Sequence, residues 1–119
     1  MTARKEELQA LLAKVEAGWP EHIDQAYMPP FLAAFDMTWV AMKAWQANEG
    51  SIDAFVALAG ATLPGWWWQV AAPWDGKAHV ALYPPKMDAT ERSCGSNPDP
   101  ARAGLIAILK ALIAKEGDA

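Results

Sequence analysis

The stretch that decides the fold is LPGWWWQVAAPW, residues 63–74, in which a Pro-Gly break precedes three consecutive tryptophans. The short, bulky segment Trp66–Ala71 is typical of a β-strand. Successive side chains of a strand point to opposite faces, so Trp67 lies on one face and its two tryptophan neighbours on the other. A sheet covered on one face only would leave Trp67 in water. We therefore expect helices on both faces of this strand.

A second strand follows after the turn-forming stretch APWDGK. Residues 77–83 alternate, with Ala78, Val80 and Leu82 on one side. The two strands form a predicted β-hairpin, which Pro84-Pro85 ends. Residues 87–93 supply a weaker candidate for a third strand.

Four helices are expected around this hairpin. The first spans residues 2–17, and its apolar face repeats at helical spacing through Leu8, Leu11, Leu12 and Val15. The second is opened by Pro30 and closed by ANEGS at 47–51. The third is capped by Ser51 and ends at Pro64-Gly65, and the fourth runs from Asp99-Pro100 to Glu116. In the third helix the residues expected to face inward are Ile52, Phe55, Val56 and Ala59.

The second expected helix has a surplus of apolar side chains. Leu32, Phe35, Trp39 and Met42 form one stripe, and further aromatic residues widen it beyond half of the circumference. Such a helix is buried on two sides, or is buried on one side and paired with another subunit on the other.

These elements predict an α+β fold. The expected architecture is a three-layer helix–sheet–helix sandwich with a small antiparallel sheet, built on a Trp-rich β-hairpin and an apolar C-terminal helix. The 119 residues form a single expected domain, 1–119, with an N-terminal helical part (1–50) and a sheet-containing part (51–119).

Composition excludes several classes of protein. The net charge of −4 argues against general nucleic-acid binding, which needs a basic face. Cys94 is the only cysteine, so no internal disulfide forms and a reducing compartment is expected. The N-terminus lacks the apolar segment of a signal peptide. The uncharged stretch between Asp53 and Asp75 is broken by Pro64-Gly65, so no membrane span and a cytoplasmic location are predicted.

Three segments of the chain carry a family resemblance. SIDAFVALAGATLPGWWWQV (51–70), ALYPP (81–85) and DPARAGLIAILKALIAKE (99–116) resemble the phage ABA sandwich family of small phage and prophage proteins. The resemblance covers 51–116, and LPGWWW is its most specific element. It implies a helix–sheet–helix architecture and a bacterial host cell, but the family has no established activity to transfer. The ERSCGSN stretch departs from the family pattern, and residues 1–50 lie outside it.

Catalytic and metal signatures are missing from the sequence. His22 and His79 are far apart and have no Cys, Asp or Glu at ligand spacing. Cys94 has no neighbouring His to activate it. Asp99 at the start of the last helix disfavours a bound anion there. We therefore expect no enzyme activity, no metal and no cofactor.

Three functional hypotheses remain open, and homo-oligomerisation is compatible with each. The first is stoichiometric binding to a host protein, for example as an anti-defence inhibitor. The second is sequestration of a small ligand such as a nucleotide signal, and the third is a virion or structural accessory subunit. Partner-binding candidates are Phe35, Asp36, Trp39 and Trp45. Ligand-binding candidates are Trp67, Trp74 and Tyr83 for stacking and Lys77, His79 and Arg92 for phosphate. An exposed Trp67 beside Lys77 and Tyr83 would favour the ligand hypothesis, and a covered Trp67 would shift attention to Trp39 and Trp45.

Overall fold

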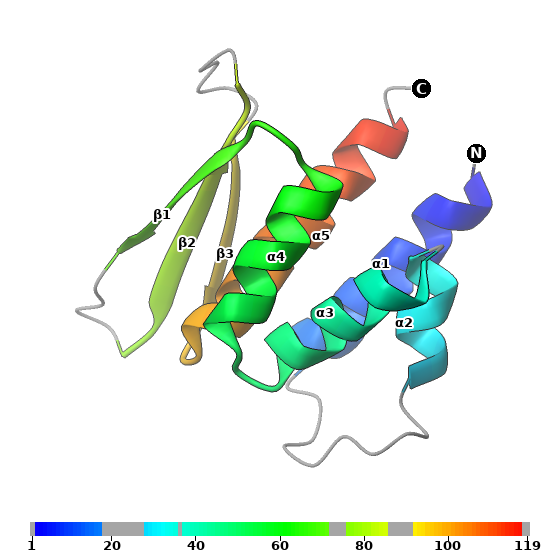
Figure 1. Cartoon of the computed structure of the whole chain (residues 1–119), viewed down its shortest axis with the longest axis horizontal. Coiled ribbons are helices and arrows are strands. Elements are labelled where there is room, and N and C mark those ends of the chain that lie inside the picture. Colours follow the sequence, from blue (N-terminus) through cyan, green and yellow to red (C-terminus); the bar gives the residue numbers. More distant parts are fainter. Residues whose placement is uncertain (1, 18–27, 36, 72–75, 86–91, 118–119) are drawn as a thin grey trace.

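The computed structural model describes residues 2–17, 28–35, 37–71, 76–85 and 92–117 (Figure 1). These residues form five helices and one three-stranded antiparallel sheet, so the predicted α+β class is confirmed. The elements are α1 (Thr2–Glu16), α2 (Met28–Ala34), α3 (Thr38–Asn48), α4 (Ile52–Thr62), β1 (Trp67–Ala71), β2 (Ala78–Tyr83), β3 (Ser93–Asn97) and α5 (Pro100–Gly117).

The sheet has the strand order β1-β2-β3, and both neighbouring pairs are antiparallel. The predicted hairpin is confirmed, with Trp67 opposite Tyr83. The third strand, β3, begins at Ser93, the last residue of the range 87–93 suggested for it, and residues 86–91 lie outside the described ones. Its sequence, SCGSN, has low β-propensity. Tertiary contacts hold it instead, since Ser93 Oγ donates a hydrogen bond to the Ala107 carbonyl oxygen of α5 at 2.6 Å.

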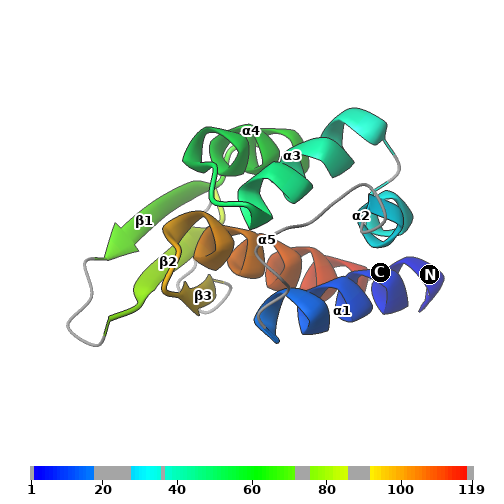
Figure 2. The same ribbon diagram turned by 90° about the horizontal axis from the view of Figure 1, so that it is seen from below.

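The order of the layers differs from the expected one. Helix α5 packs on β2 and β3, and α4 lies beside α5 and reaches β1 through Phe55, whose ring meets the Trp68 indole edge-on at 5.3 Å. Helices α1, α2 and α3 lie on the side of α4 and α5 that faces away from the sheet (Figures 1 and 2). Among the described residues all helices lie on the same side of the sheet. The sheet is therefore an outer layer, not the central one, and its second face is open.

Ring stacking between β1 and β2 explains how Trp67 can lie on a sheet face that no described helix covers. The Trp67 ring lies parallel to the Tyr83 ring across the hairpin, with 4.1 Å between centroids and 13° between planes. This contact removes part of the indole from water without a covering helix, and 38% of Trp67 stays exposed.

The single helix expected between Pro30 and residue 47 is two helices. Helix α2 ends at Ala34, and α3 begins after Met37, whose extended backbone precedes its first turn. The break separates the predicted apolar stripe, because Phe35 is buried while Leu32, Trp39 and Met42 are exposed. The buried face of α3 consists mainly of small residues, namely Val40, Ala41, Ala44, Ala47 and Asn48.

Helix caps follow the prediction closely. Ser51 Oγ accepts a hydrogen bond from the Ala54 amide at 3.1 Å at the start of α4. Asp99 Oδ1 accepts one from the Ala101 amide at 2.8 Å at the start of α5. The inward face of α4 differs from the expected one, since Ile52 and Val56 are exposed and the buried residues are Ala54, Phe55, Leu58 and Ala59. Both caps fix where the two helices beneath the sheet begin.

Candidate functional site: the open face of the sheet

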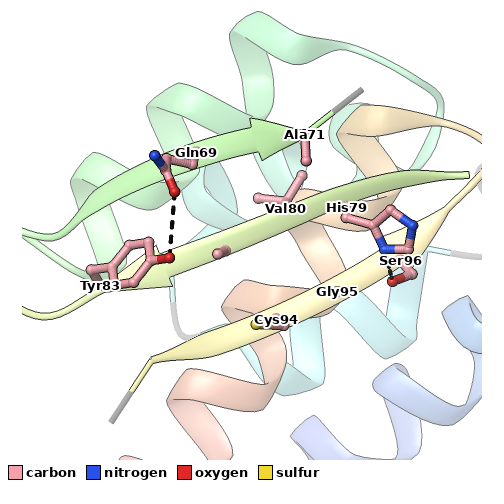
Figure 3. A pocket seen from close by; sticks show the side chains of 9 residues that line it. Gln69, Ala71, His79, Val80, Tyr83, Cys94, Gly95 and Ser96 are labelled. Atoms are coloured by element: carbon pink, nitrogen blue, oxygen red, sulfur yellow. Dashed lines mark hydrogen bonds between the residues drawn. The ribbon is translucent and has the colours of Figure 1, made fainter. Parts of the chain in front are cut away.

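The open face of the sheet is the most distinctive surface of the described structure. Residues paired across an antiparallel sheet point to the same side, and successive residues alternate. Val80 and Leu82 point toward the helices and are buried, so their neighbours in β2 point outward. The open face is formed by Trp67, Gln69, Ala71, His79, Ala81, Tyr83, Cys94 and Ser96. Figure 3 shows this side of the sheet, with the helices behind it.

Aromatic side chains gather at one end of the open face. There the Trp67–Tyr83 stack joins β1 to β2. The Tyr83 hydroxyl donates a long hydrogen bond of 3.4 Å to Gln69 Oε1, which directs the phenol along the sheet (Figure 3). The strands hold both rings in place, which lowers the entropy that a partner must remove on binding.

The opposite end of the open face is polar. His79 Nδ1 and Ser96 Oγ share a hydrogen bond of 2.7 Å between β2 and β3 (Figure 3). Cys94 is exposed between the two ends. A depression of about 270 Å³ lies on this face and is lined by residues of all three strands. Pockets for small ligands are concave and typically measure about 300–1,000 Å³. The depression is therefore slightly smaller than the usual ligand site.

No residue of the open face is Asp or Glu, although the chain as a whole is acidic. Two exposed cations flank the face: Lys77 precedes β2, and Arg92 precedes β3. Arg92 lies at the end of the sheet that holds Tyr83, because the next residue, Ser93, pairs with Leu82. Lys77 lies at the other end. Tyr83 follows His79 by four positions along β2, a span of roughly 13 Å at 3.3–3.4 Å per residue.

The structure thus divides the predicted ligand-binding residues. It brings Trp67 and Tyr83 into contact and places Arg92 at the same end of the sheet. Lys77 and His79 lie at the opposite end, roughly 13 Å or more away along β2 at 3.3–3.4 Å per residue. Trp74 lies outside the described residues. The arrangement that would favour a ligand is an exposed Trp67 beside both Tyr83 and Lys77. The structure places Tyr83 beside Trp67, but it places Lys77 at the other end of the sheet.

The predicted partner-binding residues separate as well. Phe35 is 2% exposed and belongs to the core, so it is not available to a partner. Asp36 lies outside the described residues. Trp39 is 51% exposed on α3. Trp45 packs partly against the core, and its buried Nε1 has no hydrogen-bond partner among the described residues.

Besides two alanines, three residues of the open face were not predicted as site residues: Gln69, Cys94 and Ser96. The alternation of the first strand already placed Gln69 on the face of Trp67. No comparable signal existed for Cys94 and Ser96, because the position of β3 was not predicted. Their placement follows from the pairing of Ala81 with Cys94 and of His79 with Ser96.

In the described part of the chain, no helix is both long and apolar enough to cross a membrane. Likewise, no three His, Cys, Asp or Glu side chains among those residues gather closely enough to hold a metal ion.

Comparisons with known proteins found no relative. A scan against protein-family models gave no match, and neither curated proteins nor solved structures gave one.

Proposed function

We propose that the protein is a non-catalytic binding protein that masks a surface of a partner protein with the open face of its sheet. The observation that carries this proposal is the Trp67–Tyr83 stack on a sheet face that no described element covers. Tryptophan and tyrosine are the residues that most often dominate the energy of protein interfaces. Here both are partly exposed and held in place before binding.

The shape of the open face favours a macromolecular partner over a small ligand. A depression of about 270 Å³ is slightly below the usual size of small-molecule pockets, whereas an exposed aromatic pair on a sheet face suits a protein partner. The flanking Lys77 and Arg92 and the lack of acids on the face suit a partner surface with an acidic rim.

The origin of the partner is proposed from the sequence. The resemblance of residues 51–116 to phage ABA sandwich proteins supports a phage or prophage protein that acts on a protein of its bacterial host. Inhibition of a host defence protein is one role that such stoichiometric masking would serve. This part of the proposal is independent of the open face itself.

Cys94 allows a direct test, because it is the only cysteine and lies on the open face. A photo-crosslinker attached to Cys94 should form an adduct with one host protein in a bacterial lysate. Replacing Trp67 with alanine should lower the affinity for that protein by about tenfold or more, as for a central aromatic hot spot.

The matched control moves the crosslinker to α4 with the double change Cys94→Ser and Ala61→Cys, since Ala61 is exposed there. This position should give no adduct with the same protein. Equal adducts from both positions, or binding that survives Trp67→Ala, would contradict the proposal.

A nucleotide ligand is the second candidate, favoured by the stacked aromatic pair and by Arg92 at the same end. A base would stack on the exposed side of the pair while Arg92 meets the phosphate. Saturable quenching of tryptophan fluorescence by one nucleotide, lost in Trp67→Ala and Arg92→Ala but kept in Lys77→Ala, would favour this candidate.

A further inference from the structure

The outer edge of β1 is unpaired in the described structure. β2 occupies one side of β1, and no described strand pairs with the other side. All five residues of β1 are exposed, and none is charged, Pro or Gly. Charges, prolines and bulges are the usual features that prevent an edge strand from pairing with another chain. β1 has neither charges nor prolines, so its edge is open to a further strand.

We propose that the edge of β1 pairs with the same edge of a second copy, in antiparallel orientation, to form a continuous six-stranded sheet. The residue pattern of WWQVA is self-complementary in this arrangement. With a twofold axis at Gln69, Trp67 faces Ala71 of the second copy and Trp68 faces Val70 of the second copy. Each large side chain is thus opposite a small or medium one on the same face of the sheet, and Gln69 faces its own copy.

The register is specific because the two faces of β1 differ. Trp68 and Val70 lie on the helix side, where Phe55 of α4 contacts Trp68. Trp67 and Ala71 lie on the open face. A shift by one residue would oppose residues that point to different faces, and among the registers that keep the faces matched only the one centred on Gln69 pairs all five residues of β1.

The exposed side-chain area of β1 limits the stability of the dimer. Trp67 and Trp68 each remain 38% exposed, and Val70 remains 43% exposed. Since a tryptophan buries about 150–250 Å² in full, the two indoles leave roughly 100–200 Å² per copy. Stable interfaces bury about 800 Å² per partner, so association through β1 is weak and depends on protein concentration.

The charge of the chain predicts the effect of salt. Two copies of net charge −4 repel each other, whereas the paired edges carry no charge. Salt screens the repulsion with a Debye length of about 10 Å at 0.1 M and leaves the strand pairing intact. Dimerisation should therefore strengthen as salt increases, opposite to an interface held by ion pairs.

Position 69 gives a sharp test, because a twofold axis places each Gln69 beside its own copy. Sedimentation velocity of the full chain should show a rising dimer fraction from micromolar to near-millimolar concentration. Gln69→Lys alone and Gln69→Glu alone should both be monomeric, since like charges then face each other. An equimolar mixture of the two variants should recover dimer, because opposite charges meet. Ala61→Lys and Ala61→Glu, on exposed α4, are the charge-matched controls and should dimerise like the parent chain.

A parent chain that stays monomeric throughout would overturn the proposal. So would dimers that persist in both Gln69 variants, or that are lost in Trp39→Ala, because the interface would then lie elsewhere. The proposal does not depend on the proposed function, since the pairing leaves the open face exposed.

Discussion

Replacing Gly95 with alanine should destabilise the protein by about 3 kcal/mol or more, a large fraction of the 5–15 kcal/mol that stabilises a typical domain. Gly95 lies in the middle of β3 and points toward α5, which packs directly on this strand. An added Cβ would lie 2.8 Å from the Ala107 backbone nitrogen and closer still to the Ala103 carbonyl oxygen. Both neighbours belong to the backbone of a helix, so no side-chain rotation relieves the clash. The helix has to move away from the sheet.

Thermal unfolding followed by circular dichroism checks this prediction. The midpoint Tm should fall by roughly 10–15 °C in a chain of this length. Gly60→Ala is the matched control, because Gly60 lies in α4 with no atom near its missing Cβ. That change should stabilise the protein by about 0.5–1 kcal/mol through helix propensity. A Gly95→Ala variant as stable as the parent would show that α5 does not lie so close to β3.

Replacing Phe55 with alanine should cost about 3–5 kcal/mol, the usual range for a buried phenylalanine. Phe55 is fully buried in α4 and contacts both layers around it. Its ring meets Trp68 of β1 edge-on at 5.3 Å. On the other side it fills the space above Gly104 of α5, where an added Cβ would lie 2.9 Å from Phe55 Cγ and closer to two other ring atoms. Phe55 therefore joins β1, α4 and α5.

A double-mutant cycle tests this fit. In the parent chain Gly104→Ala should destabilise by about 1–3 kcal/mol, because the methyl group meets the ring. In the Phe55→Ala background the ring is gone, so the same change should be neutral or stabilising through helix propensity. Denaturant unfolding measures all four proteins. An unchanged cost of Gly104→Ala in both backgrounds would place Phe55 away from α5.

Local signals were sufficient to predict most element boundaries. Ser51 and Asp99 cap α4 and α5 as expected, because a short polar side chain directly before a helix can accept a hydrogen bond from an unpaired amide of its first turn. Pro64-Gly65 separates α4 from β1, and Gly65 adopts the positive φ of +86° that favours glycine. The alternation of Ala78, Val80 and Leu82 correctly predicted the buried face of β2.

The break between α2 and α3 had no local signal. Neither Gly nor Pro occurs between Phe31 and Asn48, and the apolar spacing continues through the break. The tertiary structure decides it, because Phe31 and Phe35 are buried while the inner face of α3 is lined mainly by alanines. Spacing alone could not separate a single long helix from two short ones.

The open face could not be predicted because a tryptophan can be shielded from water in two ways, by a covering helix or by a neighbouring side chain on the same sheet face. Indole on both faces of β1 suggested a covering helix on each side. The structure instead covers part of Trp67 with Tyr83, a cross-strand contact that depends on register. Register follows from the whole hairpin and from β3, whose sequence resembles a loop. The sequence therefore predicted three residues of the site, namely Trp67, Tyr83 and His79. It did not predict that this face of the sheet is exposed.

The rate at which the Cys94 thiol reacts with a small thiol reagent in the folded protein tests the openness of this face most directly. Cys94 is exposed beside Ala81 in the middle of the sheet, where a second layer of helices would bury it. We predict native labelling within about tenfold of the rate in denaturant, with little dependence on protein concentration. A thiol that reacts only when the protein unfolds would show that the second face is covered, and the proposed binding surface would not exist.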